Sequence, residues 1–298
     1  MRVAFHTLGC KLNFAETSTL AGKFLEQGYE RVDFNEEADV YVINTCSVTS
    51  KADRKSKEAI KKARNRNPQA KIIAVGCYAQ LQSEKIANIE GVDLILGSNE
   101  KFRILEYLQN YEAKEEPEIH TCALDDAVKY YPSYSKGDRT RSFLKIQDGC
   151  DYACTYCTVP LARGKSRNQS IWSILDEASC IADSDIKEVV LTGVNIGDFG
   201  KSTGESFYEL INQLEKVGGI ERFRISSIEP NLLNDEIIRF VAQSEKFLPH
   251  FHIPLQSGCN EILAKMKRRY RRELLIDRLE QIKKHIPGAF VGVDVIVG

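Results

Sequence analysis

The sequence predicts an α/β protein with an N-terminal doubly wound parallel sheet, followed by a partial β/α barrel. Three observations support this prediction. Short apolar runs alternate with helical patterns along most of the chain, an order typical of parallel sheets. The length of 298 residues is sufficient for two domains. Residues 112–141 are rich in charge, Pro and Gly without periodicity, which indicates a linker between the two parts.

In the N-terminal domain, residues 1–111, four apolar runs predict strands, and a helical pattern follows each of them. The expected strands are residues 2–6, 40–44, 71–75 and 92–96. The expected helices are residues 13–27, 50–66, 79–88 and 99–110. Because each strand is followed by its own helix, we expect a parallel sheet with helices on both faces.

Residues 142–298 repeat the alternation of strand and helix, which predicts a barrel-type parallel sheet. The expected strands are residues 143–147, 188–192, 222–225, 250–254 and 291–297. The expected helices are residues 171–182, 206–217, 234–244 and 260–284.

The composition is that of an ordinary globular protein, with 43% hydrophobic and 28% charged residues and a net charge of −1. No apolar run has the length of a membrane span and the first residues do not form a signal peptide, so we expect a cytoplasmic protein without a membrane partner. Nine cysteines cannot all pair within one chain, and in a reducing compartment cysteines are typical of metal or redox sites. The oligomeric state stays open.

Cys150, Cys154 and Cys157 follow the first expected barrel strand at spacings of four and three residues. Thiolate ligation suits iron–sulfur clusters, whose cubane form takes about four Cys, so that three would leave one iron open. The alternatives are buried thiols or a zinc knuckle completed by a distant ligand. The C-x3-C-x2-C pattern, with Tyr156 before its last Cys, resembles the loop of radical S-adenosylmethionine (SAM) enzymes. This resemblance implies a 4Fe-4S cluster whose open iron binds SAM, and an electron that cleaves SAM to a 5′-deoxyadenosyl radical.

Cys10, Cys46 and Cys77 each lie just beyond the carboxyl end of an expected strand. The carboxyl ends of parallel strands share one edge of a sheet, where ligands bind and where helix N-termini lower the pKa of thiols. We interpret these residues as a second three-thiolate cluster site with an open iron. Three small buried cysteines are the alternative.

The segments Thr7-Leu-Gly-Cys-Lys-Leu-Asn13, Asn44-Thr-Cys-Ser-Val48 and Val75-Gly-Cys77 are similar to the three cysteine boxes of the radical-SAM methylthiotransferases. With the second triplet, the resemblance covers nearly the whole chain. It implies a transferase with two 4Fe-4S clusters, an electron donor, and two SAM molecules, one as the methyl source for sulfur and one as the radical source. It implies no catalytic side chain beyond the cluster ligands. The two open irons are expected to face one cavity.

The Gly-Cys-Lys-Leu-Asn box and residues 52–57 resemble the branch that acts on N6-threonylcarbamoyladenosine next to the tRNA anticodon. We therefore expect a methylthio group to be added to C2 of this nucleoside in tRNA. The isopentenyladenosine branch tends to carry Gly-Cys-Gln-Met-Asn, and the ribosomal-protein branch Gly-Cys-Pro-Lys-Asn. These two activities are alternatives, as is a non-catalytic zinc or RNA-binding module. The family normally continues beyond the fifth barrel strand and adds a TRAM domain, so we expect a barrel truncated after that strand.

Polar and glycine residues at the ends of the expected barrel strands match SAM-binding positions of the family, with ordinary turns as the alternative. The residues expected to bind SAM are Tyr156, Gly193, Asn195, Ser227, Glu229 and Gln256.

Two basic runs favour RNA binding, because basic faces bind phosphate backbones. Residues 51–71 contain nine Lys or Arg and two acidic residues, and residues 265–272 form the second run, with an aromatic residue inside it. The alternative is a solvated helix face, and for Arg163 and Arg167 also a contact with the SAM carboxylate. The residues expected to bind RNA are Arg54, Lys55, Arg163, Arg167, Arg269 and Tyr270.

Overall fold

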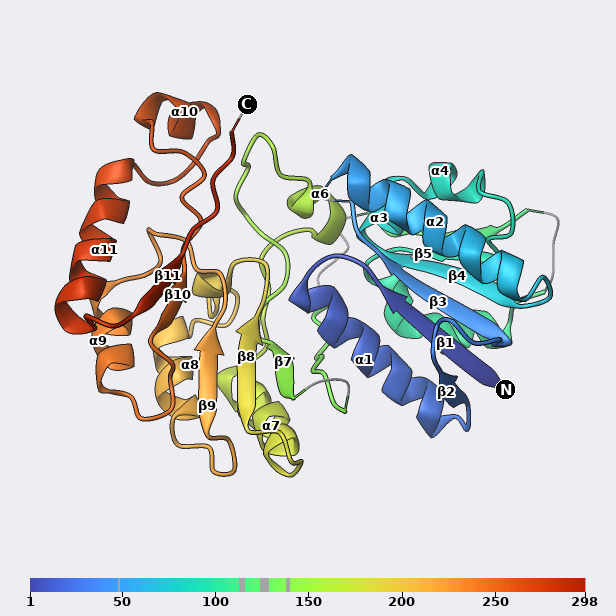
Figure 1. The fold of residues 1–298 in the computed structure, drawn as a ribbon, viewed down its shortest axis with the longest axis horizontal. Helices are drawn as coiled ribbons and strands as arrows, with labels where there is room; N and C mark the ends of the chain where they lie inside the picture. Colours follow the sequence, from blue (N-terminus) through green and yellow to red (C-terminus); the bar gives the residue numbers. More distant parts are fainter. Residues whose placement is uncertain (48, 113–115, 124–128, 138–139, 298) are drawn as a thin grey trace. The chain divides into compact units, whose positions relative to one another are not determined.

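The computed structural model describes residues 1–47, 49–112, 116–123, 129–137 and 140–297 (Figure 1). The chain forms two compact units. Unit 1 comprises Met1–Ser135 together with Leu161–Gly164, and unit 2 comprises Lys136–Pro160 together with Lys165–Gly298. Each unit contains parallel β-structure and helices, so the expected α/β class is confirmed. No helix of the described residues is both long and apolar enough to span a membrane.

Unit 1 is built on one parallel sheet with the strand order β2-β1-β3-β4-β5-β6. Its strands are β1 (Arg2–Thr7), β2 (Glu30–Val32), β3 (Val40–Thr45), β4 (Lys71–Gly76), β5 (Leu94–Leu96) and β6 (Glu118–His120). The order of the strands reverses between β1 and β3, and ligands of open α/β sheets bind at such a point. The two short edge strands were not expected, and β6 lies within the segment that we expected to be a linker.

Helices cover both faces of this sheet, as the alternation of strand and helix predicted (Figure 1). They are α1 (Lys11–Glu26), α2 (Ser50–Arg66), α3 (Cys77–Leu81), α4 (Ser83–Ala87), the 3-10 helix η1 (Glu100–Arg103) and α5 (Ile104–Gln109). Successive side chains of a strand point to opposite faces. Accordingly, Tyr41 of β3 belongs to the core that contains Ile60 of α2, and Val42 belongs to the core that contains Phe24 of α1.

Unit 2 contains parallel strands arranged as part of a barrel. The strands β7 (Arg141–Lys145), β8 (Glu188–Thr192) and β9 (Arg222–Ile225) form one sheet, and β10 (His250–His252) pairs with β11 (Phe290–Gly292). Parallel bridges between Ser227 and His252 and between Phe223 and Phe247 connect β9 and the segment after it to β10 and the segment before it. The helices are α7 (Ile171–Ala182), η3 (Ile196–Asp198), α8 (Phe207–Leu214), α9 (Asp235–Gln243), α10 (Asn260–Lys265) and α11 (Arg272–His285). The short helix α6 (Val159–Arg163) begins in unit 2 and ends in the segment that belongs to unit 1.

The expected helix 260–284 is interrupted between α10 and α11. Lys267 adopts a φ of 56°, in the left-handed region, where an α-helix cannot continue. Tyr270 is only 6% exposed, and its hydroxyl donates to the carbonyl oxygens of Pro254 and Leu255 at 2.6 and 2.7 Å. The helix therefore ends before Lys267, and the segment that follows it buries Tyr270.

Candidate iron–sulfur and SAM sites

The strand ends of unit 1 bring Cys10, Cys46 and Cys77 to one edge of the sheet. Cys46 and Cys77 directly follow the paired residues Thr45 and Gly76 at the ends of β3 and β4. The loop of Cys10 follows β1, the other neighbour of β3, so this edge is also the point at which the strand order reverses. A Cβ placed on Gly9 would lie 2.9 Å from the Sγ of Cys46, so the loop that carries Cys10 lies against Cys46.

A network of buried side chains fixes these loops. The amide Nδ2 of Asn13 donates to the carbonyl oxygens of Leu8 at 2.8 Å and Thr45 at 3.2 Å, which ties the Cys10 loop to the end of β3. The hydroxyl of Thr45 donates to the carbonyl oxygen of Val75 at 2.7 Å and accepts from the backbone N–H of Ala79 at 3.2 Å, which ties β3 to the Cys77 loop. The sequence singled out Asn13 and Thr45 only as parts of matching boxes; their role as ties depends on contacts between strands.

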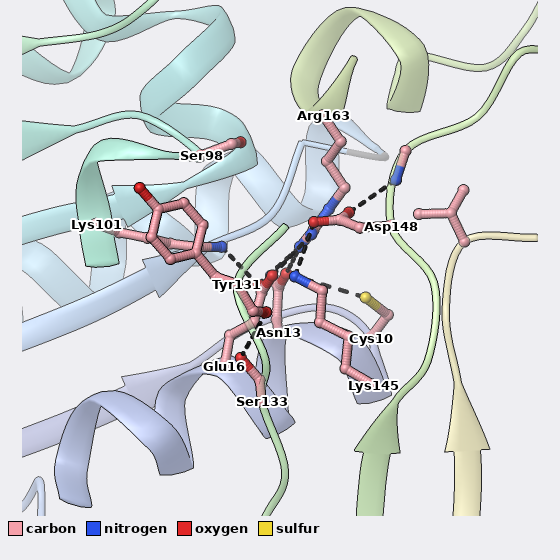
Figure 2. A network of polar contacts seen from close by, with 12 residues as sticks. Cys10, Asn13, Glu16, Ser98, Lys101, Tyr131, Ser133, Lys145, Asp148 and Arg163 are labelled. Atoms are coloured by element: carbon pink, nitrogen blue, oxygen red, sulfur yellow. Dashed lines mark hydrogen bonds and ion pairs between the residues drawn. The ribbon is translucent and has the colours of Figure 1, made fainter. Parts of the chain in front are cut away.

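Arg163 belongs to the segment that the chain contributes to unit 1, and Figure 2 shows its surroundings. The guanidinium donates to both carboxylate oxygens of Glu16, at 2.9 and 3.0 Å, and to Oδ1 of Asn13 at 2.6 Å. Lys101 donates to the same carboxylate at 2.5 Å, and Ser98 donates to the carbonyl oxygen of Ala162 at 2.6 Å. The side chain of Arg163 is 3% exposed. The expectation that Arg163 contacts RNA or the SAM carboxylate therefore does not fit, since its donors are directed to buried groups of unit 1.

The donor set of unit 1 consists of three cysteines, and thiolate ligation suits an iron–sulfur cluster. Every cysteine of the described residues is a thiol, not half of a disulfide. Among the same residues, no three Cys, His, Asp or Glu side chains are placed to hold one metal ion. Thiolates that bind a cubane cluster each bind a different iron, so they lie farther apart than the ligands of one ion. Desolvation of the sulfur raises the pKa of Cys10, Arg163 opposes this, and Cys77 lies near enough to raise it further.

The second triplet lies in the loop that follows β7. The backbone N–H of Cys157 donates to the carbonyl oxygen of Cys154 at 3.1 Å, which makes a turn between these residues. Burial raises the pKa of Cys150 to about 12, and both Cys154 and Cys157 contribute, so the three sulfurs are electrostatic neighbours. Buried thiols ionise when a metal supplies the compensating positive charge. Three neighbouring thiols in one loop fit the cluster that the sequence predicts.

The glycine-rich loop after β8 is fixed against the end of β7. Oε1 of Gln147 accepts from the backbone N–H groups of Val194 and Asn195 at 2.9 and 2.8 Å. A Cβ on Gly193 would lie 2.9 Å from the carbonyl oxygen of Gln147, so only glycine fits there. Oδ1 of Asn195 and Oδ1 of Asn231 are buried and have no hydrogen-bond partner among the described residues. Such acceptors fit a ligand that brings donors, as the ammonium and hydroxyl groups of SAM would.

The structure places the other residues expected to bind SAM around the same strand ends. Ser227 lies at the bridge beyond β9, and Gln256 beyond β10 has a φ of 61°, which is uncommon outside glycine. The carboxylate of Glu229 is paired with Arg268, which also donates to the hydroxyl of Tyr156 at 3.2 Å. The sequence did not single out Asn231, Gln147 or Arg268. A basic run identified the neighbourhood of Arg268 only as a possible RNA contact.

Comparisons with known proteins show the family of the chain. The model of the Radical SAM superfamily matches residues 144–298, and that of Uncharacterized protein family UPF0004 matches residues 2–97. The chain is 40% identical to threonylcarbamoyladenosine tRNA methylthiotransferase MtaB of Aquifex aeolicus, over 100% of this chain and 73% of that protein. The chain belongs to the radical SAM tRNA methylthiotransferases. The cofactors of this family, iron–sulfur clusters and SAM, are those that the sequence predicted.

Two further relatives show how much of a related protein the chain spans. MtaB of Bacillus subtilis is 42% identical over 99% of this chain, which spans 66% of that relative. The tRNA-2-methylthio-N(6)-dimethylallyladenosine synthase of Hydrogenobaculum sp. is 32% identical, over 100% of this chain and 70% of that protein. The chain thus spans about two thirds of the length of these relatives.

Among solved structures, the radical SAM methyltransferase TsrM of Kitasatospora setae is similar, with a TM-score of 0.68, 12% identity, and coverage of 100% of this chain and 68% of that one. The cobalamin-dependent radical SAM enzyme OxsB has a TM-score of 0.63 and 15% identity, over 99% of this chain and 49% of that chain. These likenesses support the fold alone.

In this methylthiotransferase, the residues expected to bind RNA differ in their accessibility. Arg54 and Lys55 are exposed on α2. Arg54 pairs with Glu58 at 3.6 Å and lines a surface hollow whose charged residues are Arg54, Lys57, Lys61, Lys85, Glu58 and Glu90. Arg269 is exposed as well.

Besides Arg163, two more of the expected RNA contacts do not fit the structure. Arg167 is largely buried and donates to Asp148 at 3.1 Å, so its guanidinium is directed inward. Tyr270 has its ring buried and its hydroxyl bound to backbone carbonyls, which leaves it no face on which a base could stack.

Proposed function

We propose that this chain transfers a methylthio group to C2 of N6-threonylcarbamoyladenosine in tRNA, next to the anticodon. The observation that carries the proposal is the pair of three-cysteine sets, one at the carboxyl ends of three parallel strands of unit 1 and the other in the loop that follows β7 of unit 2. The relatives named threonylcarbamoyladenosine tRNA methylthiotransferase support this substrate, with identities of 42% and 40%. The dimethylallyladenosine synthase is less similar, at 32%, and represents the second candidate substrate.

Each unit would hold one cluster, and unit 2 would also bind SAM. Cys10, Cys46 and Cys77 would hold one cluster of unit 1, and the triplet after β7 would hold the cluster that binds SAM. When bound, these groups supply the radical that attacks a strong C–H bond and the sulfur and methyl group that replace the hydrogen. Asn195 would accept from the ammonium of SAM, because its Oδ1 is buried with no other partner among the described residues.

The exposed basic face of α2 would bind the phosphate backbone of tRNA, and Arg269 would add a contact on unit 2. Charge alone carries such contacts, and each phosphate that is neutralised releases counterions. The Arg54→Gln, Lys55→Gln double variant should weaken tRNA binding and reduce the slope of log K against log salt by about one for each phosphate that is no longer neutralised. Lys187→Gln, an exposed lysine outside both basic runs, is the matched control and should leave the slope unchanged. Equal slopes in all three proteins would remove α2 from the RNA surface.

Iron counting tests the cluster assignment without any activity measurement. Anaerobically reconstituted protein should bind about eight irons per chain, at about four per cubane cluster. Replacing Cys10, Cys46 and Cys77 by Ala should remove half of the iron, and replacing the other triplet should remove the other half. A colourless protein that holds zinc would instead establish the non-catalytic module.

Nucleoside mass spectrometry tests the substrate. Cells that lack the protein should lose 2-methylthio-N6-threonylcarbamoyladenosine from their tRNA and keep the unmodified nucleoside. Loss of the methylthio group from dimethylallyladenosine, with threonylcarbamoyladenosine unaffected, would assign the second candidate substrate. We further propose that the enzyme works in the cytoplasm with an external electron donor.

A further inference from the structure

The chain turns sharply after α10 and runs back along the cysteine loop of unit 2. Lys267, in the left-handed region, is followed by Arg268, whose backbone N–H donates to the carbonyl oxygen of Leu263 at 2.9 Å. The N–H of Lys267 donates to the carbonyl oxygen of Ala264 at 3.0 Å. These two bonds form the reverse turn that ends many helices. They fix the direction in which the side chain of Arg268 leaves the backbone.

The same turn holds the backbone of the cysteine loop. The N–H of Thr155 donates to the carbonyl oxygen of Met266 at 3.3 Å, and its hydroxyl donates to the carbonyl oxygen of Lys265 at 3.3 Å. Arg269 donates to the carbonyl oxygen of Asp151 at 2.8 Å. Lys265, Met266 and Arg269 therefore fasten the loop between its first and last cysteines, and none of these three bonds involves a thiol.

Arg268 contacts one of the three thiols directly. Its Nη1 donates to the Sγ of Cys154 at 3.3 Å and to the hydroxyl of Tyr156 at 3.2 Å. Its Nη2 pairs with the carboxylate of Glu229, which comes from the loop after β9. The side chains of Arg268 and Glu229 are 4% and 14% exposed. Arginine keeps its charge at all accessible pH values, so a permanent cation donates to Cys154.

We propose that Arg268 is a positioning residue that sets the reduction potential of the cluster held by Cys150, Cys154 and Cys157. Reduction adds negative charge to a cluster and its sulfurs, and a donor aimed at a ligating sulfur stabilises that charge. Arg268 therefore makes the cluster easier to reduce. Glu229 holds the guanidinium in place and moderates its charge. The proposal rests on the function proposed above for this triplet.

The test uses the full chain, with Cys10, Cys46 and Cys77 replaced by Ala so that only the second cluster assembles. In this background, Arg268→Met keeps the aliphatic stem and removes the charge and the donors. Arg271→Met, in the same basic run, is the matched control, because this arginine is exposed. Potentiometric titration followed by electron paramagnetic resonance gives the potential, and SAM affinity is measured in parallel.

We expect Arg268→Met to disfavour reduction of the cluster about tenfold, which is about 59 mV for a one-electron couple. Arg268→Lys should restore part of the shift, and Arg271→Met should leave the potential unchanged. An unchanged potential together with weakened SAM binding would overturn the proposal, since the guanidinium would then serve the ligand.

Two further results keep the test decisive. If Arg268→Met binds no iron, Arg268→Lys is measured in its place. Lysine keeps the charge but loses the planar pair of donors, so the potential should fall by less than the shift expected for Arg268→Met, and an unchanged or raised potential would overturn the proposal. If the background protein itself binds no iron, the cluster assignment of the triplet fails, and the role of Arg268 fails with it. Iron binding with an unchanged potential refutes only the role of Arg268.

Discussion

Gly76 has the backbone on which the cysteine edge of unit 1 depends, and Gly76→Ala should disrupt that edge. Its φ of 98° and ψ of −154° belong to a region that is essentially restricted to glycine, and entering it costs another residue about 1–3 kcal/mol. An added Cβ would also lie 2.4 Å from Oδ1 of Asn44 and 2.9 Å from the carbonyl oxygen of Thr45. Gly76 directly precedes Cys77, so the strain falls on a proposed cluster ligand.

The contact with Asn44 is hard to relieve. Its Nδ2 donates to the carbonyl oxygen of Asn13 and to the hydroxyl of Thr17, each at 3.0 Å. Moving the side chain breaks these two buried hydrogen bonds, at about 1 kcal/mol each. Together with the backbone strain, Gly76→Ala should lower the free energy of unfolding of unit 1 by about 3–5 kcal/mol. Domains are stable by only about 5–15 kcal/mol, so this is a large fraction.

Gly28→Ala is the matched control. Gly28 also has a positive φ, of 78°, but nothing lies within 4 Å of an added Cβ. This variant should lower the free energy of unfolding only by the strain of a side chain at positive φ, which is about 1–2 kcal/mol.

For both variants, the free energy of unfolding of the metal-free chain is measured in urea, and hydrogen exchange of the peptides that cover β3 and β4 serves as the readout. After reconstitution, Gly76→Ala should also hold about half of the iron, since only the cluster of unit 2 assembles. If Gly76→Ala is no less stable than Gly28→Ala and keeps its full iron content, the steric reasoning is wrong.

Three further changes test buried polar groups by urea unfolding. Burial raises the pKa of Glu177 from 4.5 to about 8, so the folded state keeps a proton that the unfolded state loses, and stability should fall as pH rises through this interval, by up to about 1.4 kcal/mol per pH unit. Glu177→Gln should abolish this slope, and an equal slope in both proteins would contradict the assignment. Thr45→Val leaves the N–H of Ala79 without its acceptor and should cost about 1–3 kcal/mol; a neutral result would show that the tie is dispensable. Arg163→Met removes a buried partner of Glu16 and should cost about 3–5 kcal/mol, whereas a cost below about 1 kcal/mol would mean that Lys101 alone suffices.

Elements with a strong local pattern were predicted with their observed bounds. The helix 50–66, the helix 171–182 and the strands 188–192 and 222–225 all match α2, α7, β8 and β9. Their periodicity lies within the element itself, and the caps of the two helices, Thr49 and Ser170, directly precede them. The edge strands β2 and β6 have three residues each, too few to show a period, and exist because a neighbouring strand offers its backbone groups.

The six proposed cluster ligands could also be predicted from the sequence, because the prediction needs only the positions of the cysteines relative to the expected strands. Cysteines that come directly after parallel strands share an edge, whatever the packing around them. The residues that hold these ligands in place could not be predicted from the sequence. Arg163 meets Glu16 across 147 positions of the chain, and no local pattern distinguishes it from an arginine that faces RNA.

What the sequence by itself determined, then, is the α/β class, the order along the chain of all strands except β2 and β6, and the existence of two sets of three cysteines. Spacing and periodicity carry that information, since both are properties of neighbouring residues. Only the tertiary structure decided where the long charged side chains point. Tyr270 and Arg268 lie in one basic run, yet one is buried against backbone carbonyls and the other donates to a thiol, because partners distant in sequence supply the groups that compensate their burial.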